Sequence, residues 1–448
     1  MLLNSGASSV EVSALSSEAR VLGVWALCPA RFGGDAYGAS CSQWVNRVEE
    51  FGDVLRYFVT TSRGLEDALA EELTELGGLG VEVAHGGASV EGAPELLPNL
   101  NIGIATGLRV LVPVASSRCR DGDDLYDLVQ SVDWSGFLSP TGRLAVTVVG
   151  RGGPQLEHAG FATLRTKDAV VDQFRARFGA RPGVDREQPD LRIHVHLSSE
   201  RVTVSLDASG VSLHRRGYRL GAGDAALRET LAAGILRYAG WRPGSSLVDL
   251  TCGSGTFVIE AARRARGYAP GDRLGDLGYW NWRGEGVEAS WTRAGHEAAL
   301  RAWRAPSERA SAAPLLGFDV DPAMVSLARE NAERAGVGDL TRFEQRDLRD
   351  TSDLPAPGDS SVVICNPPYG ERMGVTGDLV ELYRAIGDTF KKNARGYRGA
   401  VLSPLGRLAK SIGLRSRRRH AIWNGGIECR LLLFELYDGT RRQRSAGA

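Results

Sequence analysis

The sequence predicts an α/β protein whose larger part is an open, mostly parallel β-sheet, preceded by a smaller α+β part. Three observations lead to this prediction. Residues 246–262 have the pattern of a short apolar strand, a glycine-rich turn and a helix. Residues 315–335 repeat the strand and the helix with acidic residues between them, and residues 341–347 and 361–366 add two more short strands. Strands that alternate with helices build parallel sheets, and ligands bind where those strands end.

The glycine turn is the first candidate binding element. Gly253 and Gly255 allow a sharp turn and a close approach of the backbone to a ligand. Helical composition begins at Thr256, and a helix start beneath a glycine turn favours a negatively charged group. A dinucleotide-binding fingerprint needs a third glycine three residues after Gly255, where this chain has Val258. We therefore expect a ligand with a smaller anionic end, and S-adenosylmethionine fits through its carboxylate.

Acidic residues end the next two predicted strands. Asp319 is expected to bind ribose hydroxyls, as the acid after the second strand does in doubly wound folds, with Val320 packing on the adenine. Asp321 is predicted to cap the following helix, which has Pro322 at its first position. Asp347 is predicted to accept a hydrogen bond from the adenine amine, and a solvated loop carboxylate is the alternative.

The fourth strand ends in the run Asn366-Pro367-Pro368-Tyr369. The two prolines stiffen the backbone and remove two N–H donors. The Asn366 side chain and the Pro367 carbonyl can accept both hydrogens of a flat amino group, while the Tyr369 ring can stack on the attached aromatic system. Methylation of a nitrogen is the chemistry that this run indicates. A surface turn between a strand and a helix is the alternative.

These motifs, in this order, resemble those of class I S-adenosylmethionine-dependent methyltransferases. A longer resemblance, from about Tyr57 to about Tyr437, is to THUMP-containing RNA methyltransferases. Within them, the chain is similar to the bacterial 23S ribosomal RNA guanine-N2 methyltransferase family, specifically its N2-modifying half. Several unusual strings in the right order carry this resemblance, at residues 58–73, 166–172, 181–185, 189–192, 206–210, 213–219 and 227–232.

The resemblance implies a Rossmann-like sheet of seven strands with an antiparallel last strand, S-adenosylmethionine as cofactor and RNA as partner. It implies that a flipped guanine and its N2 amine are held by Asn366, Pro367, Pro368 and Tyr369. It implies that the methionine end of the cofactor is lined by Asp249, Gly253, Ser254, Gly255 and the helix start at Thr256. Arg228 and Glu229 lie in the segment that closes over that end, and a salt-bridged helix start is the alternative. Asp319 takes the ribose and Asp347 the adenine.

The resemblance also divides the chain into parts. Residues 1–54 form a tail that is disordered or does not match the family. A ferredoxin-like subdomain at 55–115, a THUMP RNA-binding domain at 116–210 and a methyltransferase domain at 211–448 follow. The last contains an insertion at 267–314. Larger members carry a second methyltransferase domain, and because this chain ends at Ala448 we expect the second activity to be absent.

Basic and aromatic residues give the candidate RNA contacts. They are Arg165, Lys167, Arg372, Arg417, Arg418 and Arg419. The last three precede an Asn-Gly hairpin signal at Asn424, and we expect them close to the cofactor face, a solvated sheet edge being the alternative. The insertion holds four tryptophans that either stack on RNA or pack inward, and inward packing is favoured: Trp280, Trp282, Trp291 and Trp303.

Composition and net charge exclude few classes of function. The 54 basic and 54 acidic residues balance, which counts mildly against RNA binding, although local patches suffice. The six cysteines show no C-x-x-C spacing and no pairing with histidines, so neither a metal site nor a disulfide framework is expected. No apolar run reaches membrane-spanning length and no protein partner is indicated, so we expect a cytoplasmic protein.

Other functions are compatible with parts of the pattern. A transfer RNA guanine-N2 methyltransferase shares both the THUMP-like part and the NPPY run. The NPPY run also serves adenine-N6 methylation in DNA and glutamine methylation in release factors. From a different class, the chain is compatible with a non-catalytic RNA-binding assembly factor, which the intact Asn366 and glycine turn disfavour. A dinucleotide dehydrogenase is disfavoured by the glycine spacing.

Overall fold

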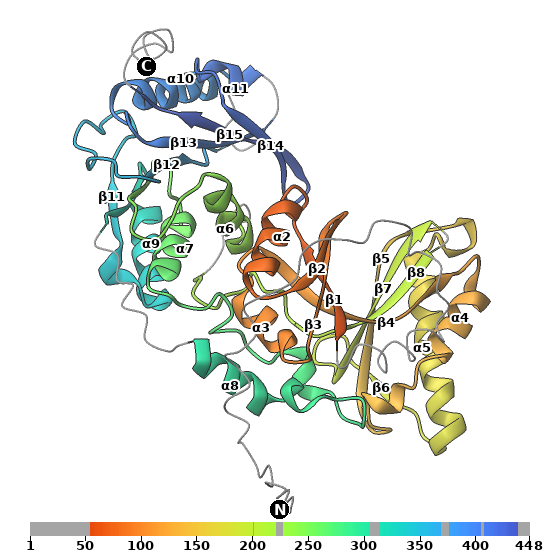
Figure 1. Cartoon of the computed structure of the whole chain (residues 1–448). Coiled ribbons are helices and arrows are strands. Elements are labelled where there is room, and N and C mark those ends of the chain that lie inside the picture. Colours follow the sequence, from red (N-terminus) through yellow and green to blue (C-terminus); the bar gives the residue numbers. More distant parts are fainter. Residues whose placement is uncertain are drawn as a thin grey trace, which may run out of the picture.

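The computed structural model describes residues 54–199, 201–220, 227–303, 313–368, 376–404 and 407–437, and the tail expected at 1–54 falls outside this part except for its last residue. Within these residues the strands form two sheets, one of eight and one of seven strands. Figure 1 shows the two sheets at opposite ends of an elongated molecule, with α2 (Glu66–Glu75) between them.

The first sheet has the strand order β2-β3-β1-β4-β8-β7-β5-β6. Its strands are β1 (Leu55–Thr61), β2 (Leu79–Ala84), β3 (Gly87–Gly92), β4 (Gly107–Arg118), β5 (Arg143–Gly152), β6 (Gly183–Val184), β7 (Leu191–Ser199) and β8 (Arg201–Asp207). The helices α3 (Leu96–Gly103), α4 (Gly122–Gln130) and α5 (Ala159–Phe178) accompany it. Strand β4 pairs with β1 on one side and with β8 on the other. The boundary expected between residues 115 and 116 therefore falls inside a strand, and one continuous sheet joins the two parts.

Local sequence signals account for two features of this region. Helix α5 ends at Phe178 and is followed by Gly179 in the left-handed conformation that suits a helix C-terminus. Strands β7 and β8 alternate buried and less buried residues and pair antiparallel from Ile193 opposite Leu206 to Ser198 opposite Arg201. Their inward residues are buried in the core of this sheet.

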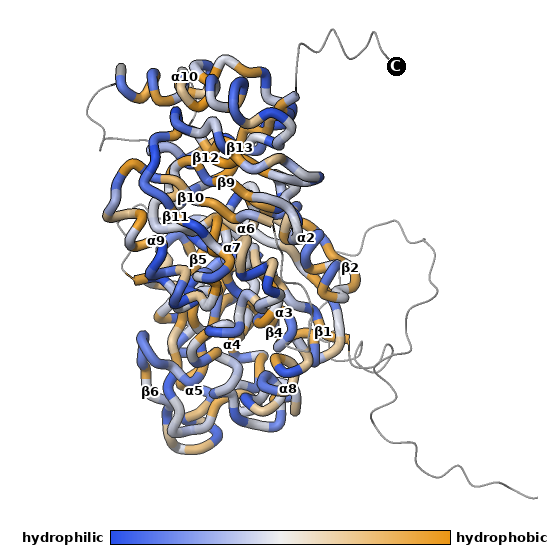
Figure 2. Tube along the Cα trace, turned by 90° about the vertical axis from the view of Figure 1, so that its left-hand side faces the viewer, coloured by the Kyte–Doolittle hydropathy of each residue, from blue (hydrophilic) through white to orange (hydrophobic). Residues whose placement is uncertain are grey.

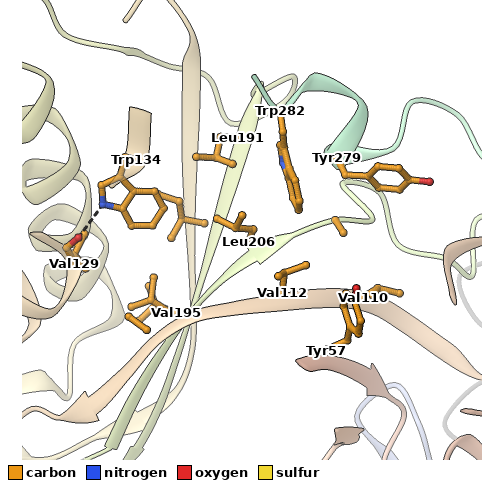
Figure 3. Packing of buried hydrophobic residues seen from close by; sticks show 14 of the residues in the cluster. Tyr57, Val110, Val112, Val129, Trp134, Leu191, Val195, Leu206, Tyr279 and Trp282 are labelled. Carbon is orange, nitrogen blue, oxygen red and sulfur yellow. Dashed lines mark hydrogen bonds between the residues drawn. The ribbon is translucent and has the colours of Figure 1, made fainter. Parts of the chain in front are cut away.

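Residues 274–303 of the insertion expected at 267–314 pack on this first sheet. They contain short turns at Gly278–Asn281 and Ala289–Trp291, followed by α8 (Arg293–Trp303). Trp282 and Trp291 are buried, and Figure 3 shows Tyr279 and Trp282 lying over the same core as Leu206 and Val112. The Trp291 indole donates to the Pro94 carbonyl at 2.9 Å. Inward packing is thus confirmed for these two tryptophans.

The second sheet has the order β11-β10-β9-β12-β13-β15-β14. Its strands are β9 (Leu247–Asp249), β10 (Leu315–Asp319), β11 (Arg342–Gln345), β12 (Val362–Cys365), β13 (Arg398–Pro404), β14 (Arg418–Asn424) and β15 (Ile427–Glu435). The pairs from β11 to β13 are parallel, and β15 runs antiparallel to both of its neighbours. This confirms the predicted seven-stranded sheet with an antiparallel last strand.

Helices cover both faces of the second sheet. One face carries α6 (Glu229–Tyr238), α7 (Thr256–Ala265) and α9 (Pro322–Ala335), and the other α10 (Thr376–Lys392) and α11 (Arg407–Ser411) (Figure 1). Leu247 of β9 packs toward the first group and Val248 toward the second. Because both faces are buried there, the central parallel strands are mostly apolar, and Figure 2 shows this apolar stripe along β9, β10, β12 and β13.

The part of the chain that forms the first sheet contacts the second sheet through the loop that follows β1. Gly64 has a φ of +88°, and a Cβ added there would lie 1.9 Å from the Ala421 carbonyl oxygen of β14. The Trp423 amide donates to the Arg63 carbonyl at 3.1 Å, and the Arg63 guanidinium lies 4.2 Å from the centre of the Trp423 ring. On α6, Arg237 bridges to Glu71 and Glu75 of α2. The first sheet is thus docked directly on the edge strand and one helix of the second.

In the described part of the chain, every helix is too short or too polar to cross a membrane.

Candidate active site

The site lies where β10, β9 and β12 end. Asp249 of β9 stands opposite Gly317 of β10 and Ile364 of β12, so the three parallel strands finish at one edge. The chain order reverses between β9 and β12, which is the position where open α/β sheets bind ligands. This register brings together the glycine turn, Asp319 and Asn366, all of which the sequence predicted.

Three hydrogen bonds hold the glycine turn against the neighbouring strands. The Leu250 amide donates to the Ile364 carbonyl (2.9 Å), and the Cys252 amide donates to the Phe318 carbonyl (2.8 Å). The Gly253 amide donates to the Asp319 carboxylate (2.8 Å). The turn is therefore fixed to β12 on one side and to β10 on the other.

The two glycines of the turn have different tasks. Gly255 has a φ of +87°, and an added Cβ would lie 3.0 Å from both Ala328 and the Phe343 ring, so a side chain there would be strained and crowded. Gly253 also has a positive φ, +49°, but an added Cβ would meet nothing within 4 Å. The space above Gly253 is open, as a ligand that rests on this turn requires.

Asp249 lies beneath the turn and is 1 % exposed. Its carboxylate accepts from the Thr251 amide at 3.1 Å. Burial raises the pKa of Asp249 to about 8, and the nearby charge of Asp319 acts in the same direction. Asp249 is therefore a buried carboxyl group whose ionisation is costly unless a cation approaches it.

Asp319 and Val320 stand at the end of β10. The second carboxylate oxygen of Asp319 accepts from the Asp321 amide at 3.0 Å, and further lone pairs remain for a ligand. Val320 is 62 % exposed and offers an uncovered apolar surface beside it. Asp321 accepts from the Ala323 amide at 2.8 Å, which confirms its predicted role as the cap of α9.

Asp347 follows β11 and is half-buried. Its carboxylate accepts from the Arg349 amide (2.8 Å) and forms an ion pair with the Arg349 guanidinium (3.0 Å). This is the arrangement of a loop carboxylate, the alternative raised from the sequence. It does not bring Asp347 into contact with the glycine turn.

The Asn366 corner follows β12. The Asn366 amide donates to the Thr251 hydroxyl at 3.0 Å, and the side-chain oxygen Oδ1 of Asn366 is buried without a hydrogen-bond partner among the described residues. Pro367 is buried and Pro368 exposed. Tyr369 and Arg372 lie outside the described residues. Buried oxygens are normally hydrogen-bonded, so the orphaned Oδ1 indicates a place where a ligand donor belongs.

Ser254 and Thr256 are held by residues that the sequence did not single out. The Asn331 amide group of α9 donates to the Ser254 carbonyl at 3.1 Å. Arg219 donates to the Thr256 hydroxyl at 3.1 Å and to the Glu229 carboxylate at 3.2 Å, and its Nη1 is buried with no partner in the described part of the chain. Arg219 falls in one of the strings that carry the family resemblance, but nothing in its local spacing points to the turn.

Arg228 and Glu229 begin α6 in different environments. Arg228 is exposed, whereas Glu229 is 4 % exposed and paired with Arg219. Glu229 thus holds Arg219 through a buried ion pair. The sequence raised a salt-bridged helix start as the alternative, and the structure shows one that is buried at Glu229.

Two of the predicted RNA contacts lie on α5. Lys167 pairs with Asp168 at 2.8 Å and borders a cavity of about 270 Å³ that Arg175 and Arg181 also line. Arg165 pairs with Asp123, and its guanidinium lies 4.5 Å from the centre of the Tyr126 ring. Arg165 is thus committed to packing α5 against α4, while Lys167 faces a basic depression.

The prediction that Arg417, Arg418 and Arg419 lie close to the cofactor face is wrong. The strand register puts the turn after Asn424 at the edge where β12 and β13 end. Arg418 stands opposite Leu433, which in turn stands opposite Ala400 near the start of β13. Arg417 pairs with Glu435 still farther along. The three arginines therefore approach the opposite edge of the sheet.

The described residues contain no group of three or more side chains suited to hold a metal ion. Cys252 and Cys365 are buried free thiols beside the site, where they pack as small core side chains.

The strand order, the glycine turn, the acid at the second strand and the Asn-Pro-Pro corner define a class I S-adenosylmethionine-dependent methyltransferase. The solved structure of a putative methyltransferase, SMU.472, complexed with S-adenosylhomocysteine superposes with a TM-score of 0.74 at 26% identity, covering 87% of this chain and 100% of that one. TrmN from Thermus thermophilus has the same fold, with a TM-score of 0.61 at 23% identity, covering 85% of this chain and 99% of that one.

Residues 216–432 match the family profile described as RMKL-like, methyltransferase domain; residues 119–207 match the THUMP domain and residues 56–111 the RlmL ferredoxin-like domain. A putative RNA methyltransferase of Synechocystis sp., slr0064, is 38% identical over 85% of this chain and 97% of that protein. The chain therefore belongs to the THUMP-containing, RlmL-like family of S-adenosylmethionine-dependent RNA methyltransferases.

Longer relatives share the same region. The ribosomal RNA large subunit methyltransferase K/L of Syntrophotalea carbinolica is 39% identical over 88% of this chain, and that of Pseudomonas paraeruginosa is 39% identical over 86%. The chain spans about half the length of these relatives, 55% and 53% respectively.

Proposed function

We propose that this protein transfers a methyl group from S-adenosylmethionine to the exocyclic N2 of a guanosine in 23S ribosomal RNA. The observation that carries the proposal is the buried, unpaired Oδ1 of Asn366, on a corner whose backbone is bonded to the glycine turn. An acceptor without a donor, next to a cofactor-binding turn, suits a substrate amine. The names of the large-subunit K/L relatives support ribosomal RNA as the substrate.

The residues at the strand ends fit the cofactor. The open space above Gly253 and the free lone pairs of Asp319 suit the methionine end and the ribose, and exposed Val320 suits the adenine face. The buried Asp249 carboxyl and the unpaired Arg219 Nη1 offer one acid and one cation near the same turn for the amino and carboxylate groups. We propose that the cofactor is held by these residues together with Ser254, Gly255, Thr256, Arg228, Glu229 and Asp347.

When bound, S-adenosylmethionine supplies an electrophilic methyl group on its sulfonium. Asn366 Oδ1 and the Pro367 carbonyl would accept hydrogen bonds from the two N–H groups of the guanine N2 amine and so direct its lone pair, while Tyr369 would stack on the base. Pro367 and Pro368 keep this corner stiff. Orientation of this kind can contribute about 7–11 kcal/mol to lowering the barrier. The N2 proton can leave after the transfer, so no strong base is required.

Access to the guanine requires that the base leave its stack, which costs a few kcal/mol. The residues proposed to contact RNA are Arg165, Lys167 and Arg372, whereas Arg417, Arg418 and Arg419 are left out because they lie at the opposite edge of the second sheet. Among the proposed contacts Lys167 has the best setting, because it borders the basic cavity on α5. The THUMP region would grip the RNA through its shape and phosphates, since protein contacts to structured RNA mostly follow the backbone.

A transfer assay tests the proposal. Purified protein is incubated with tritium-labelled S-adenosylmethionine and either naked 23S ribosomal RNA or bulk transfer RNA, and the RNA is then digested to nucleosides. We expect N2-methylguanosine from the ribosomal RNA. Label in transfer RNA alone would favour the transfer RNA enzyme, and label in N6-methyladenosine would overturn the base assignment. No transfer to either RNA would favour the assembly factor.

A further inference from the structure

We infer that Thr251 is a positioning residue for the methyl transfer, because its hydroxyl fixes the Asn366 corner relative to the glycine turn. The inference rests on the function proposed above and deepens it. The sequence analysis assigned no role to Thr251, which stands between the buried Asp249 and the turn itself.

The Asn366 corner has few backbone donors to hold it. Pro367 and Pro368 have no N–H, so Asn366 has the only backbone N–H of the three corner residues. That N–H donates to the Thr251 hydroxyl at 3.0 Å. The orientation of the Asn366 peptide, and with it the direction of its unpaired Oδ1, therefore depends on one side chain that is 115 residues away in the sequence.

The Thr251 hydroxyl continues the row of hydrogen bonds between β9 and β12. The last backbone bond between these strands joins the Leu250 amide to the Ile364 carbonyl. Beyond it, the Thr251 hydroxyl contacts both residues that follow on the other side: it lies 3.3 Å from the Cys365 sulfur and accepts from the Asn366 amide. Burial raises the pKa of the Cys365 thiol, so the sulfur stays protonated and can share a hydrogen with the hydroxyl. The Thr251 side chain thus adds a further link between the two segments beyond the last backbone hydrogen bond.

The glycine turn is held by bonds other than those that hold the Asn366 corner. The Thr251 backbone is held by its own amide, which donates to Asp249. The next residues of the turn are held from β10, through the bond from the Cys252 amide to Phe318 and that from the Gly253 amide to Asp319. None of these bonds uses the Thr251 hydroxyl. Removal of the hydroxyl should release the Asn366 corner and leave the turn in place.

The experiment compares Thr251→Val, which keeps the shape and removes the hydroxyl, with Thr251→Ser, which keeps the hydroxyl. A misplacement of about 1 Å can cost about 100-fold in rate, so we expect Thr251→Val to lower kcat on 23S ribosomal RNA by about 10- to 100-fold. Affinity for S-adenosylhomocysteine, measured by calorimetry, should stay near that of the wild type. Thr251→Ser should recover most of the kcat.

A matched control is Thr61→Val on β1. Thr61 is also buried, and its hydroxyl donates to the Thr106 carbonyl at 2.7 Å, a bond within the first-sheet part that involves neither the glycine turn nor the Asn366 corner. It should lower thermal stability but keep kcat. Hydrogen exchange followed by NMR gives a second readout, because Asn366 carries the single backbone N–H of residues 366–368, and this N–H should exchange faster in Thr251→Val and not in Thr251→Ser.

Three results would overturn the inference: an unchanged kcat in Thr251→Val, a parallel loss of S-adenosylhomocysteine affinity, or a folded Thr251→Ser with a kcat as low as that of the valine variant. If Thr251→Val fails to fold, a folded Thr251→Ser whose kcat lies about 10-fold or more below that of the wild type would still overturn the inference. Failure of the wild type to form N2-methylguanosine would instead overturn the proposed function, so the two failures are distinct.

Discussion

The Gly253 amide donates to the Asp319 carboxylate at 2.8 Å, so the turn after the first strand and the acid after the second form one unit. Asp319 uses its other oxygen for the Asp321 amide. The carboxylate is thereby held in a fixed position while lone pairs stay available to ribose hydroxyls. Asp319 therefore accepts a hydrogen bond from the turn and is also the residue proposed to bind the ribose of the cofactor.

Replacing this acid tests its role. Hydrogen bonds to a charged group contribute about 1.5–3 kcal/mol, so Asp319→Ala should weaken S-adenosylhomocysteine binding by about tenfold or more. Isothermal calorimetry measures the dissociation constant. Asp321→Ala is the matched control: it removes the cap of α9, costs about 1 kcal/mol in stability and should leave the affinity unchanged. Equal affinities in the two variants would argue against a ribose contact at Asp319.

Asn366→Ala should have the opposite signature. It removes the oxygen that would orient the substrate amine, so turnover on ribosomal RNA should fall by about 100-fold or more, while S-adenosylhomocysteine binds as in the wild type. Initial rates and calorimetry together measure the split. Asn393→Ala, which loses a side-chain bond to Thr351 beyond the end of α10, is the control and should keep its turnover. A loss of cofactor affinity in Asn366→Ala would mean that its role is misassigned.

Asp249 predicts a dependence of stability on pH. Its pKa is raised from 3.8 in the unfolded chain to about 8 in the fold, chiefly by burial. The folded state therefore keeps a proton that the unfolded state releases, so the stabilising effect is complete below about pH 4 and is lost as the pH rises to about 8. Denaturant unfolding of the ligand-free protein at several pH values should show this decline, and Asp249→Asn should remove its share. Parallel pH profiles for the two proteins would contradict the assignment.

The junction between the two sheets predicts an effect at a glycine. Gly64→Ala places a Cβ 1.9 Å from the Ala421 carbonyl oxygen and also strains a backbone with a positive φ. Gly77→Ala is matched in φ, at +85°, but meets nothing within 4 Å, so it should cost only the strain, about 1–2 kcal/mol. Gly64→Ala should therefore lower the thermal midpoint more than Gly77→Ala does, and should lower kcat/KM on RNA because the first sheet is displaced. Equal thermal midpoints in the two variants would show that the Ala421 backbone moves away from the new Cβ without a cost in stability.

Local patterns in the sequence determined much of this protein. Short apolar strands followed by Gly253, Asp319 and Asn366 established the parallel sheet and the edge where the site lies, because strand ends are marked by the residues that follow them. The cap at Asp321 and the hairpin after Asn424 were predicted in the same way, since each depends on neighbours only a few residues away.

Contacts between distant segments were decided by the tertiary structure alone. The bond from Asn366 to Thr251 spans 115 residues, and the one from Arg219 to Thr256 links two elements with no shared motif. The continuous sheet through β4 and the far position of Arg417 follow from strand register, which local sequence does not encode. A hairpin signal reveals that the chain turns; only the pairing with β13 and β15 decides which end of the strand faces the cofactor.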